Sequence, residues 1–170
     1  LSSSKPTKWG DFIWVGGTSL AVSIRVKVAY EKSGLSGIDS FTPVEFVKYG
    51  KNKSGNFPVI PPSYFIIRVP WGGAKQDDDA SDVLRRHPHD ITCQYCQQDS
   101  TSVRQGRIII DVDSWHGDDI FRPRGAPVQY MVSQKFKDMV DACQFTNVWL
   151  IPGTKYGYDE KRWGLWYVLD

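Results

Sequence analysis

The chain has 170 residues, 41% of them hydrophobic, which is enough to bury the core of one ordinary globular domain. Lysine and arginine total 21 against 19 aspartates and glutamates, and a net charge of +2 argues against nucleic-acid binding. No apolar run approaches the roughly 18 residues of a membrane-spanning helix. Three cysteines, an odd number, favour a reducing compartment over a disulfide-bonded scaffold. We therefore expect a cytoplasmic protein whose partner is neither nucleic acid nor membrane.

Runs of apolar, β-branched and aromatic residues predict strands at residues 12–15, 44–47, 64–69, 107–112, 148–151 and 165–169. Two helices are expected between these strands, one beginning at Ser23 and one at Ser133. A serine at such a position can accept a hydrogen bond from an unpaired backbone N–H of the first helical turn. The pattern predicts an α+β fold.

The two helical segments resemble each other in sequence. At a constant offset of 110, VSIRVKVAYEKSGLSGI (residues 22–38) aligns without a gap with VSQKFKDMVDACQFTNV (residues 132–148). Each copy predicts the end of a strand, a capped helix, a turn at Gly37 or Asn147, and the start of the next strand. An internal duplication is the most economical explanation. It predicts two pseudo-equivalent strand-helix-strand units around a mixed or antiparallel sheet.

We expect these units to belong to a single domain covering residues 1–170. The first unit is placed at residues 9–47 and the second at residues 117–170. The β-rich insert between them, residues 48–116, carries an acidic run and a C-x-x-C turn.

The stretch HPHDITCQYC, residues 87–96, is the candidate metal site. Cys93 and Cys96 have a spacing that can chelate zinc, but a structural zinc ion needs four ligands, so the pair is half a site. His87 and His89 are the only nearby candidates for the other two ligands, and their spacing matches no common zinc-finger pattern. A β-turn with two reduced cysteines fits the residues equally well, and the surroundings do not favour a thioredoxin-like redox site.

A second candidate constellation surrounds His116 in DVDSWHGDD. Its four aspartates suggest a metal-dependent hydrolase, yet turn and cap roles explain the same carboxylates: Asp111, Asp113, Asp118 and Asp119. The sequence lacks a phosphate-binding loop with its lysine, a nucleophile elbow and an HExxH motif.

Four stretches, in the same order along the chain, resemble the double-CXXCG family. They are GDFIWVGGTSLAVS (10–23), LSGIDSFTPVEF (35–46), the C-x-x-C at 93 and 96, and DDIFRPRGAPVQYMVSQKFKDMVDACQFTNVWLIP (118–152). This family includes immunity proteins of bacterial polymorphic toxin systems, such as the Myxococcus swarm-killing type. The chain departs from the family pattern in two places, because Gln97 stands where the family has glycine and no second C-x-x-C precedes Trp9.

The resemblance implies a non-enzymatic immunity protein that binds a cognate toxin one to one and neutralises it by occlusion. It also implies that Cys93 and Cys96 are the remaining half of a zinc ribbon, so zinc is a possible cofactor. Tyrosine and tryptophan often anchor interfaces, and the insert places four such residues in or beside irregular segments: Tyr64, Trp71, Tyr95 and Trp115. The acidic run Asp77, Asp78 and Asp79 can add electrostatic steering toward a basic toxin, although such runs are usually solvated loops.

Overall fold

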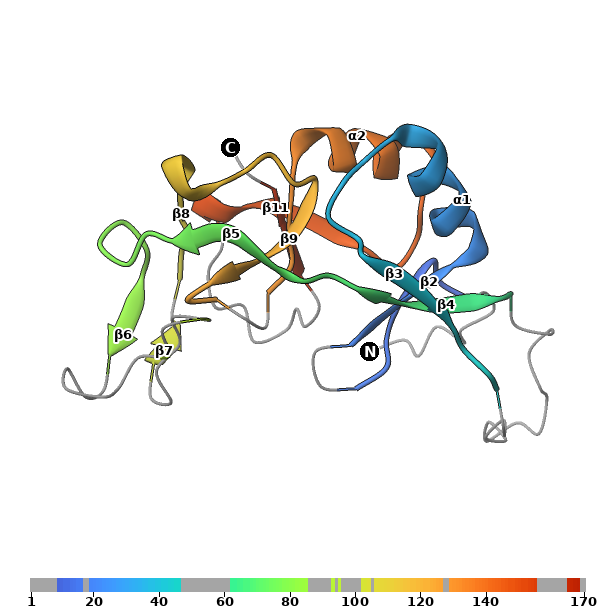
Figure 1. The fold of residues 1–170 in the computed structure, drawn as a ribbon, viewed down its shortest axis with the longest axis horizontal. Coiled ribbons are helices and arrows are strands. Elements are labelled where there is room, and N and C mark those ends of the chain that lie inside the picture. The colour runs from blue at the N-terminus through green and yellow to red at the C-terminus, as the bar shows by residue number, and fades with distance from the viewer. Residues whose placement is uncertain are drawn as a thin grey trace, which may run out of the picture.

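The computed structural model describes residues 9–16, 19–46, 62–85, 93, 95, 102–104, 106–126, 129–155 and 165–168. These residues form an α+β fold with two main β-sheets, and the two α-helices lie on one side of these sheets (Figure 1). Neither helix of the described residues has the length and apolar character that crossing a bilayer requires.

A four-stranded antiparallel sheet contains β1 (Phe12–Trp14), β2 (Leu20–Ser23), β3 (Ser40–Pro43) and β4 (Tyr64–Arg68). Its strand order is β1-β2-β4-β3, and helix α1 (Ile24–Ser33) connects β2 to β3. The sequence predicts β1 and β4 closely. It places the next strand at residues 44–47, whereas the structure forms β3 at Ser40–Pro43.

A six-stranded mixed sheet has the order β11-β12-β10-β9-β5-β8. Helix α2 (Gln134–Ala142) connects β10 to β11. The strands are β5 (Trp71–Gln76), β8 (Ile110–Asp111), β9 (Ile120–Arg124), β10 (Met131–Val132), β11 (Trp149–Pro152) and β12 (Leu165–Val168). Two 3-10 helices, η1 (Val112–Ser114) and η2 (Gly153–Lys155), follow β8 and β11. A separate pair is formed by β6 (Val83–Arg85) and β7 (Ser102–Arg104).

The segment expected as an insert contributes strands to both main sheets. β4 pairs with β2 and β3 in the four-stranded sheet. β5 follows β4 almost directly and pairs with β9 in the other sheet, so this stretch runs along both sheets (Figure 1). The expectation for residues 107–112 holds only in part, because just Ile110–Asp111 forms a strand while Ile108 is buried without one.

Both predicted helices have the expected serine caps. The Ser23 hydroxyl accepts a hydrogen bond from the Val26 backbone N–H, and the Ser133 hydroxyl accepts one from that of Phe136. Val26 and Phe136 themselves are buried in one apolar cluster between the helices and the sheets. The C-cap of α1 is Gly34, with a positive φ of 68°. The C-cap of α2 is Cys143, which stays in the right-handed conformation, and the positive φ (51°) comes one residue later at Gln144.

Two buried aspartates make a matching set of hydrogen bonds, to which Asp11 adds a further one from Arg25. Asp11 accepts from the Ser23 hydroxyl (2.7 Å), and Asp119 accepts from the Ser133 hydroxyl (2.6 Å). Their exposed fractions are only 4% and 7%. In addition, the backbone N–H of Asp11 donates to the Thr146 carbonyl oxygen, and that of Asp119 donates to the Ser36 carbonyl oxygen.

The second carboxylate oxygen of each aspartate binds the turn after the other helix. Asp11 accepts from the backbone N–H of Thr146 at 3.0 Å, and Asp119 accepts from that of Ser36 at 3.1 Å. Since Ser36 and Thr146 are also 110 residues apart, each aspartate joins its own helix cap to the opposite turn. The residues that follow them, Gly37 (φ 107°) and Asn147 (φ 60°), both have positive φ.

The two sheets share a strand order but differ in one strand direction. β9-β10-β12-β11 has the same order as β1-β2-β4-β3, with the helix in the same connection. However, β12 runs parallel to β10 and β11, whereas β4 runs antiparallel to β2 and β3. The hydrogen-bond correspondence is therefore close around the helices and is lost at this inner strand.

Candidate interaction surface

Trp71 opens β5 and lies half-buried against the next strand. The guanidinium carbon of Arg122 lies 4.3 Å from the centre of the Trp71 ring, a cation–π arrangement. The two residues are also register partners between β5 and β9. Trp71 is therefore part of the sheet rather than of an irregular segment.

Trp115 is half-buried at the end of η1. Its indole N–H donates to the Asp118 carbonyl oxygen at 3.1 Å, and its ring packs against Phe121 with centroids 6.4 Å apart. Tyr95 behaves differently, because 60% of it is exposed, with the Arg124 guanidinium 5.5 Å from its ring. Tyr64 lies in β4 and is only 2% exposed, so the structure does not place it at the surface as expected. Among the four aromatic candidates, Tyr95 has the most accessible side chain.

The acidic run forms a turn after β5. The Asp77 carboxylate accepts hydrogen bonds from the backbone N–H groups of Asp79 and Ala80, each at 3.0 Å. Asp78 accepts from the Gln76 side-chain amide at 2.9 Å. Two of these three carboxylates therefore stabilise the turn, as turn aspartates commonly do, while Asp79 is exposed.

The metal candidates lie largely outside the described residues. Cys93 is described and exposed, but Cys96, His87 and His89 lie outside the described part of the chain. Within the described residues, no group of three or more histidine, cysteine, aspartate and glutamate side chains is arranged to hold a metal ion. The third cysteine, Cys143, ends α2 and is half-buried.

Two of the four aspartates around His116 have separate structural partners. Asp111 forms an ion pair with Lys75 at 3.0 Å, and this lysine lowers the pKa of the Asp111 carboxyl. Asp119 is buried in the cap network described above. His116 is exposed, and its ring lies over Gly73 of β5, where a Cβ atom would be 2.4 Å from it.

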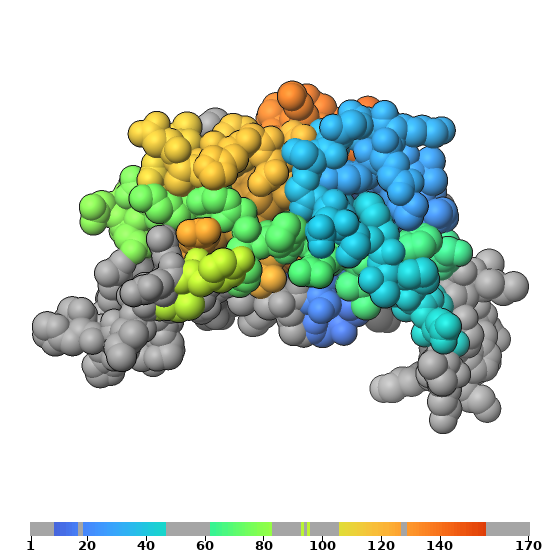
Figure 2. Space-filling view, viewed as in Figure 1, coloured from blue at the N-terminus to red at the C-terminus, as the bar shows by residue number. Residues whose placement is uncertain are grey.

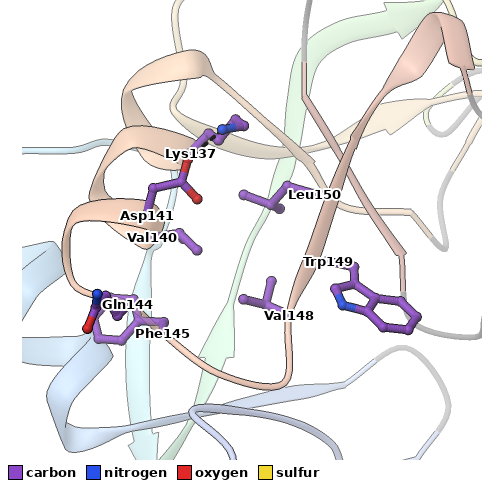
Figure 3. Close-up of a pocket in the computed structure, with 8 residues that line it drawn as sticks. All are labelled: Lys137, Val140, Asp141, Gln144, Phe145, Val148, Trp149 and Leu150. Atoms are coloured by element: carbon purple, nitrogen blue, oxygen red, sulfur yellow. Dashed lines mark hydrogen bonds and ion pairs between the residues drawn. The ribbon is translucent and has the colours of Figure 1, made fainter.

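A pocket of about 400 Å³ lies between α2 and β11 (Figure 3). Val148 and Leu150 point toward α2, whereas Trp149 points to the other side of the strand (Figure 3). Lys137 forms an ion pair with Asp141 beside the pocket, and this carboxylate raises the pKa of the lysine. Trp149 is 60% exposed, and β11 is an edge strand of its sheet.

A smaller side chain in α2 than in α1 explains the space that forms this pocket. At the offset of 110, Val140 of α2 corresponds to Tyr30 of α1. The Tyr30 ring packs against Phe41 and Phe136, and its hydroxyl accepts a hydrogen bond from the Ile38 backbone N–H at 2.9 Å. Burial raises the pKa of Tyr30. The smaller Val140 lacks this ring, which leaves space beside α2.

A second pocket, of about 510 Å³, lies on the outer face of α1. One wall is formed by α1 and the other by Cys143 and Phe145, which follow α2. Phe145 also lines the first pocket, so the two hollows adjoin. The Phe145 ring packs edge-on against Phe12 and lies 5.4 Å from the Arg25 guanidinium carbon. We call the two pockets together the Phe145 surface.

Sequence reasoning does not find the Phe145 surface. The aromatic residues that the sequence suggests as toxin contacts come from residues 48–116, whereas the Phe145 surface is built by α1, α2 and β11. The available signal was the internal alignment, which places Ile24 and Val28 opposite Gln134 and Asp138. The arrangement offers apolar contact and hydrogen bonding, which suits protein recognition.

A comparison with models of known protein families finds no match, and neither does a comparison with curated proteins.

Proposed function

We propose that the protein is an immunity protein that binds a cognate bacterial toxin one to one and neutralises it by occlusion. The ordered motifs that resemble the double-CXXCG family support this proposal. The structural observation that carries it is the Phe145 surface, where two adjoining pockets lie beside an edge strand with a largely exposed tryptophan, Trp149. Tryptophan is among the residues that most often dominate binding energy at interfaces.

The roles of the described carboxylates also favour binding over catalysis. Asp11, Asp77 and Asp119 accept hydrogen bonds that stabilise caps or turns, and Asp111 pairs with Lys75. Carboxylates held by such bonds are poor candidates for proton transfer, because that role needs one within reach of a substrate. In this proposal the chain acts in the cytoplasm, requires no cofactor for inhibition, and has no nucleic acid or membrane partner.

We also propose that the chain arose by internal duplication of a strand-helix-strand unit. The reciprocal bonds of Asp11 and Asp119 and the paired positive-φ residues support a common origin. Under this proposal, the two units came to differ in the direction of β12 and β4 after the duplication.

The alternative function is that of a metal-dependent hydrolase built on His116. The observation in its favour is that His116 is exposed and lies against Gly73, while the Asp118 carboxylate lies next to Gly72 of the same strand. Two oxygen or nitrogen donors close to one strand would need further ligands to hold a metal ion.

Co-purification separates the two functions. The protein is expressed together with the product of the neighbouring toxin gene, with the wild-type chain compared with His116→Ala. A tight complex and protection of cells by both forms support immunity. Hydrolytic turnover that His116→Ala abolishes, with the fold intact, would instead establish the hydrolase.

The aromatic candidates Trp71, Trp115 and Tyr95 and the acidic run remain proposed toxin contacts. Alanine substitutions at Trp71 and Trp115, checked for folding by circular dichroism, test them by neutralisation in cells. Folded variants that protect as well as the parent place the binding face elsewhere, and the Phe145 surface is then the first region to examine.

A further inference from the structure

We propose that the outer face of α1, together with Phe145, is the docking groove for an acidic segment of the toxin that carries apolar side chains. This inference rests on the proposed function, since the toxin is the partner. It goes further by naming the face of the protein and the chemistry of the segment that binds there.

The first observation is the apolar character of an exposed helix face. Ile24 and Val28 are one turn apart on α1 and are 37% and 39% exposed. Together with Ala29 and the Phe145 ring, they line the larger of the two described pockets of the Phe145 surface. Residues at i and i+4 form a continuous stripe, which is the pattern by which a helix contacts a partner.

The second observation is an internal comparison with α2. At the offset of 110, Gln134 and Asp138 occupy the positions of Ile24 and Val28, and their side chains hydrogen-bond to each other at 2.7 Å. Both helices have the same serine cap and the same aspartate bonds. Because α2 folds with a polar pair there, the fold does not require the apolar pair on α1.

Figure 2 shows the α1 segment in blue, exposed at the upper right beside the orange segment that contains α2. The helix itself is therefore at the surface of the molecule. An exposed apolar stripe that the fold does not need favours a binding role.

The third observation is the charge around the groove. Among the described residues, its lining contains two cations, Arg25 and Lys32, and no carboxylate. They are seven residues apart, which is about 10 Å along a helix. Arg25 already pairs with the buried Asp11 at 3.1 Å, but its side chain is mostly exposed. Glu31, next to Lys32 in sequence, pairs with Lys27 at 2.6 Å. Carboxylates on the partner therefore complement this rim.

The test copies the polar pair of α2 onto α1. The variant Ile24→Gln with Val28→Asp removes the apolar stripe, and we expect it to fold, because α2 carries the same pair. Affinity for the purified product of the neighbouring toxin gene is measured by isothermal titration calorimetry. We expect binding at least about 100-fold weaker than that of the wild-type chain.

A charge reversal tests the rim, with a control on the other helix. Lys32→Glu is expected to weaken binding by about tenfold, and the loss should shrink as salt is raised. Lys135→Glu makes the same change in net charge at the α2 position that corresponds to Arg25, and it should leave affinity within about twofold. An equal effect of both reversals would show that net charge, rather than the groove, controls binding.

The outcomes separate the two proposals. If the wild-type chain binds the toxin and the folded Ile24→Gln, Val28→Asp variant binds equally well, the toxin does not bind in this groove, while the proposed immunity function is supported. If the wild-type chain does not bind the toxin at all, both the proposed immunity function and the proposed role of the groove are wrong. Circular dichroism and thermal unfolding of each variant establish that it is folded.

Discussion

Asp11 and Asp119 form reciprocal bonds, because each carboxylate accepts from the serine cap of its own helix and from the turn that follows the other helix. One oxygen holds the start of a helix, and the other holds a turn more than 80 residues away in sequence. This arrangement fixes the two helices relative to each other over one shared apolar cluster.

Replacing Asp119 by alanine is expected to destabilise the fold by about 2–4 kcal/mol. The substitution leaves the buried Ser133 hydroxyl and the part-buried Ser36 backbone N–H without their acceptor. Chemical denaturation measures the change in the free energy of unfolding. Asp79→Ala, at an exposed position, is the matched control and should change stability by less than about 0.5 kcal/mol. Similar effects for both variants would mean that the buried bonds contribute little.

Gly37 is expected to be intolerant of substitution. Its φ is 107°, and a Cβ atom would lie 1.8 Å from the Ile120 carbonyl oxygen, so alanine must displace backbone. We expect Gly37→Ala to cost at least about 3 kcal/mol of unfolding free energy. Gly34→Ala is the control, because Gly34 also has positive φ but faces open space. Its cost should be about 1–2 kcal/mol, the backbone strain alone.

These features show why the helices were predictable and much of the sheet was not. The serines before α1 and α2 are local signals, as are the turns at Gly37 and Asn147. By contrast, β5 reads WGGAKQ and lacks a strand pattern. Gly73 of this strand leaves room for the His116 ring, which would lie 2.4 Å from a Cβ atom there, a contact that sequence alone does not reveal.

The sequence does not predict β9, for a related reason. It contains Pro123, which lacks a backbone N–H and normally argues against an inner strand. In the structure β9 pairs with both β10 and β5, and its register with β5 shifts between Trp71 and Lys75. The Phe145 surface was missed because it depends on how α1 packs beside the end of α2, which is a long-range relationship.

Alkaline pH is expected to destabilise the protein through its buried tyrosines. Burial raises the pKa of Tyr64 to about 12, with a smaller contribution from Asp11. The folded state therefore keeps this phenol protonated between pH 10 and 12, where the unfolded chain loses the proton. Stability is full below pH 10 and falls as the pH rises toward 12. Burial also raises the pKa of Tyr30 and Tyr130, which adds to the same trend.

Thermal unfolding measured from pH 9 to pH 12 tests this dependence. Tyr64→Phe should flatten the decline of the melting temperature over this range, even though it removes the hydrogen bond to the Gly10 carbonyl oxygen. Tyr95→Phe, at an exposed site, should leave the slope unchanged. If the melting temperature of Tyr64→Phe fell with pH as steeply as that of the parent, groups other than Tyr64 would cause the loss of stability at alkaline pH.

The purified chain is expected to hold well under one zinc ion per molecule. Cys93 is exposed, and one C-x-x-C supplies only half of a four-ligand site. Any zinc that is present should be removed readily by a chelator without loss of helix content. Elemental analysis before and after chelation decides this. A stoichiometric, chelator-resistant zinc ion would show that His87 and His89, or a second chain, complete the site.

Inhibition by stoichiometric occlusion can be tested by titrating the activity of the toxin with this protein. A fixed amount of the product of the neighbouring toxin gene is mixed with increasing amounts of this protein, and residual toxin activity is measured. The toxin concentration is kept well above the dissociation constant of the complex. We expect residual activity to fall linearly, to reach zero at one equivalent, and not to change with incubation time. Inactivation of many toxin molecules by one molecule of this protein, increasing with time, would contradict it.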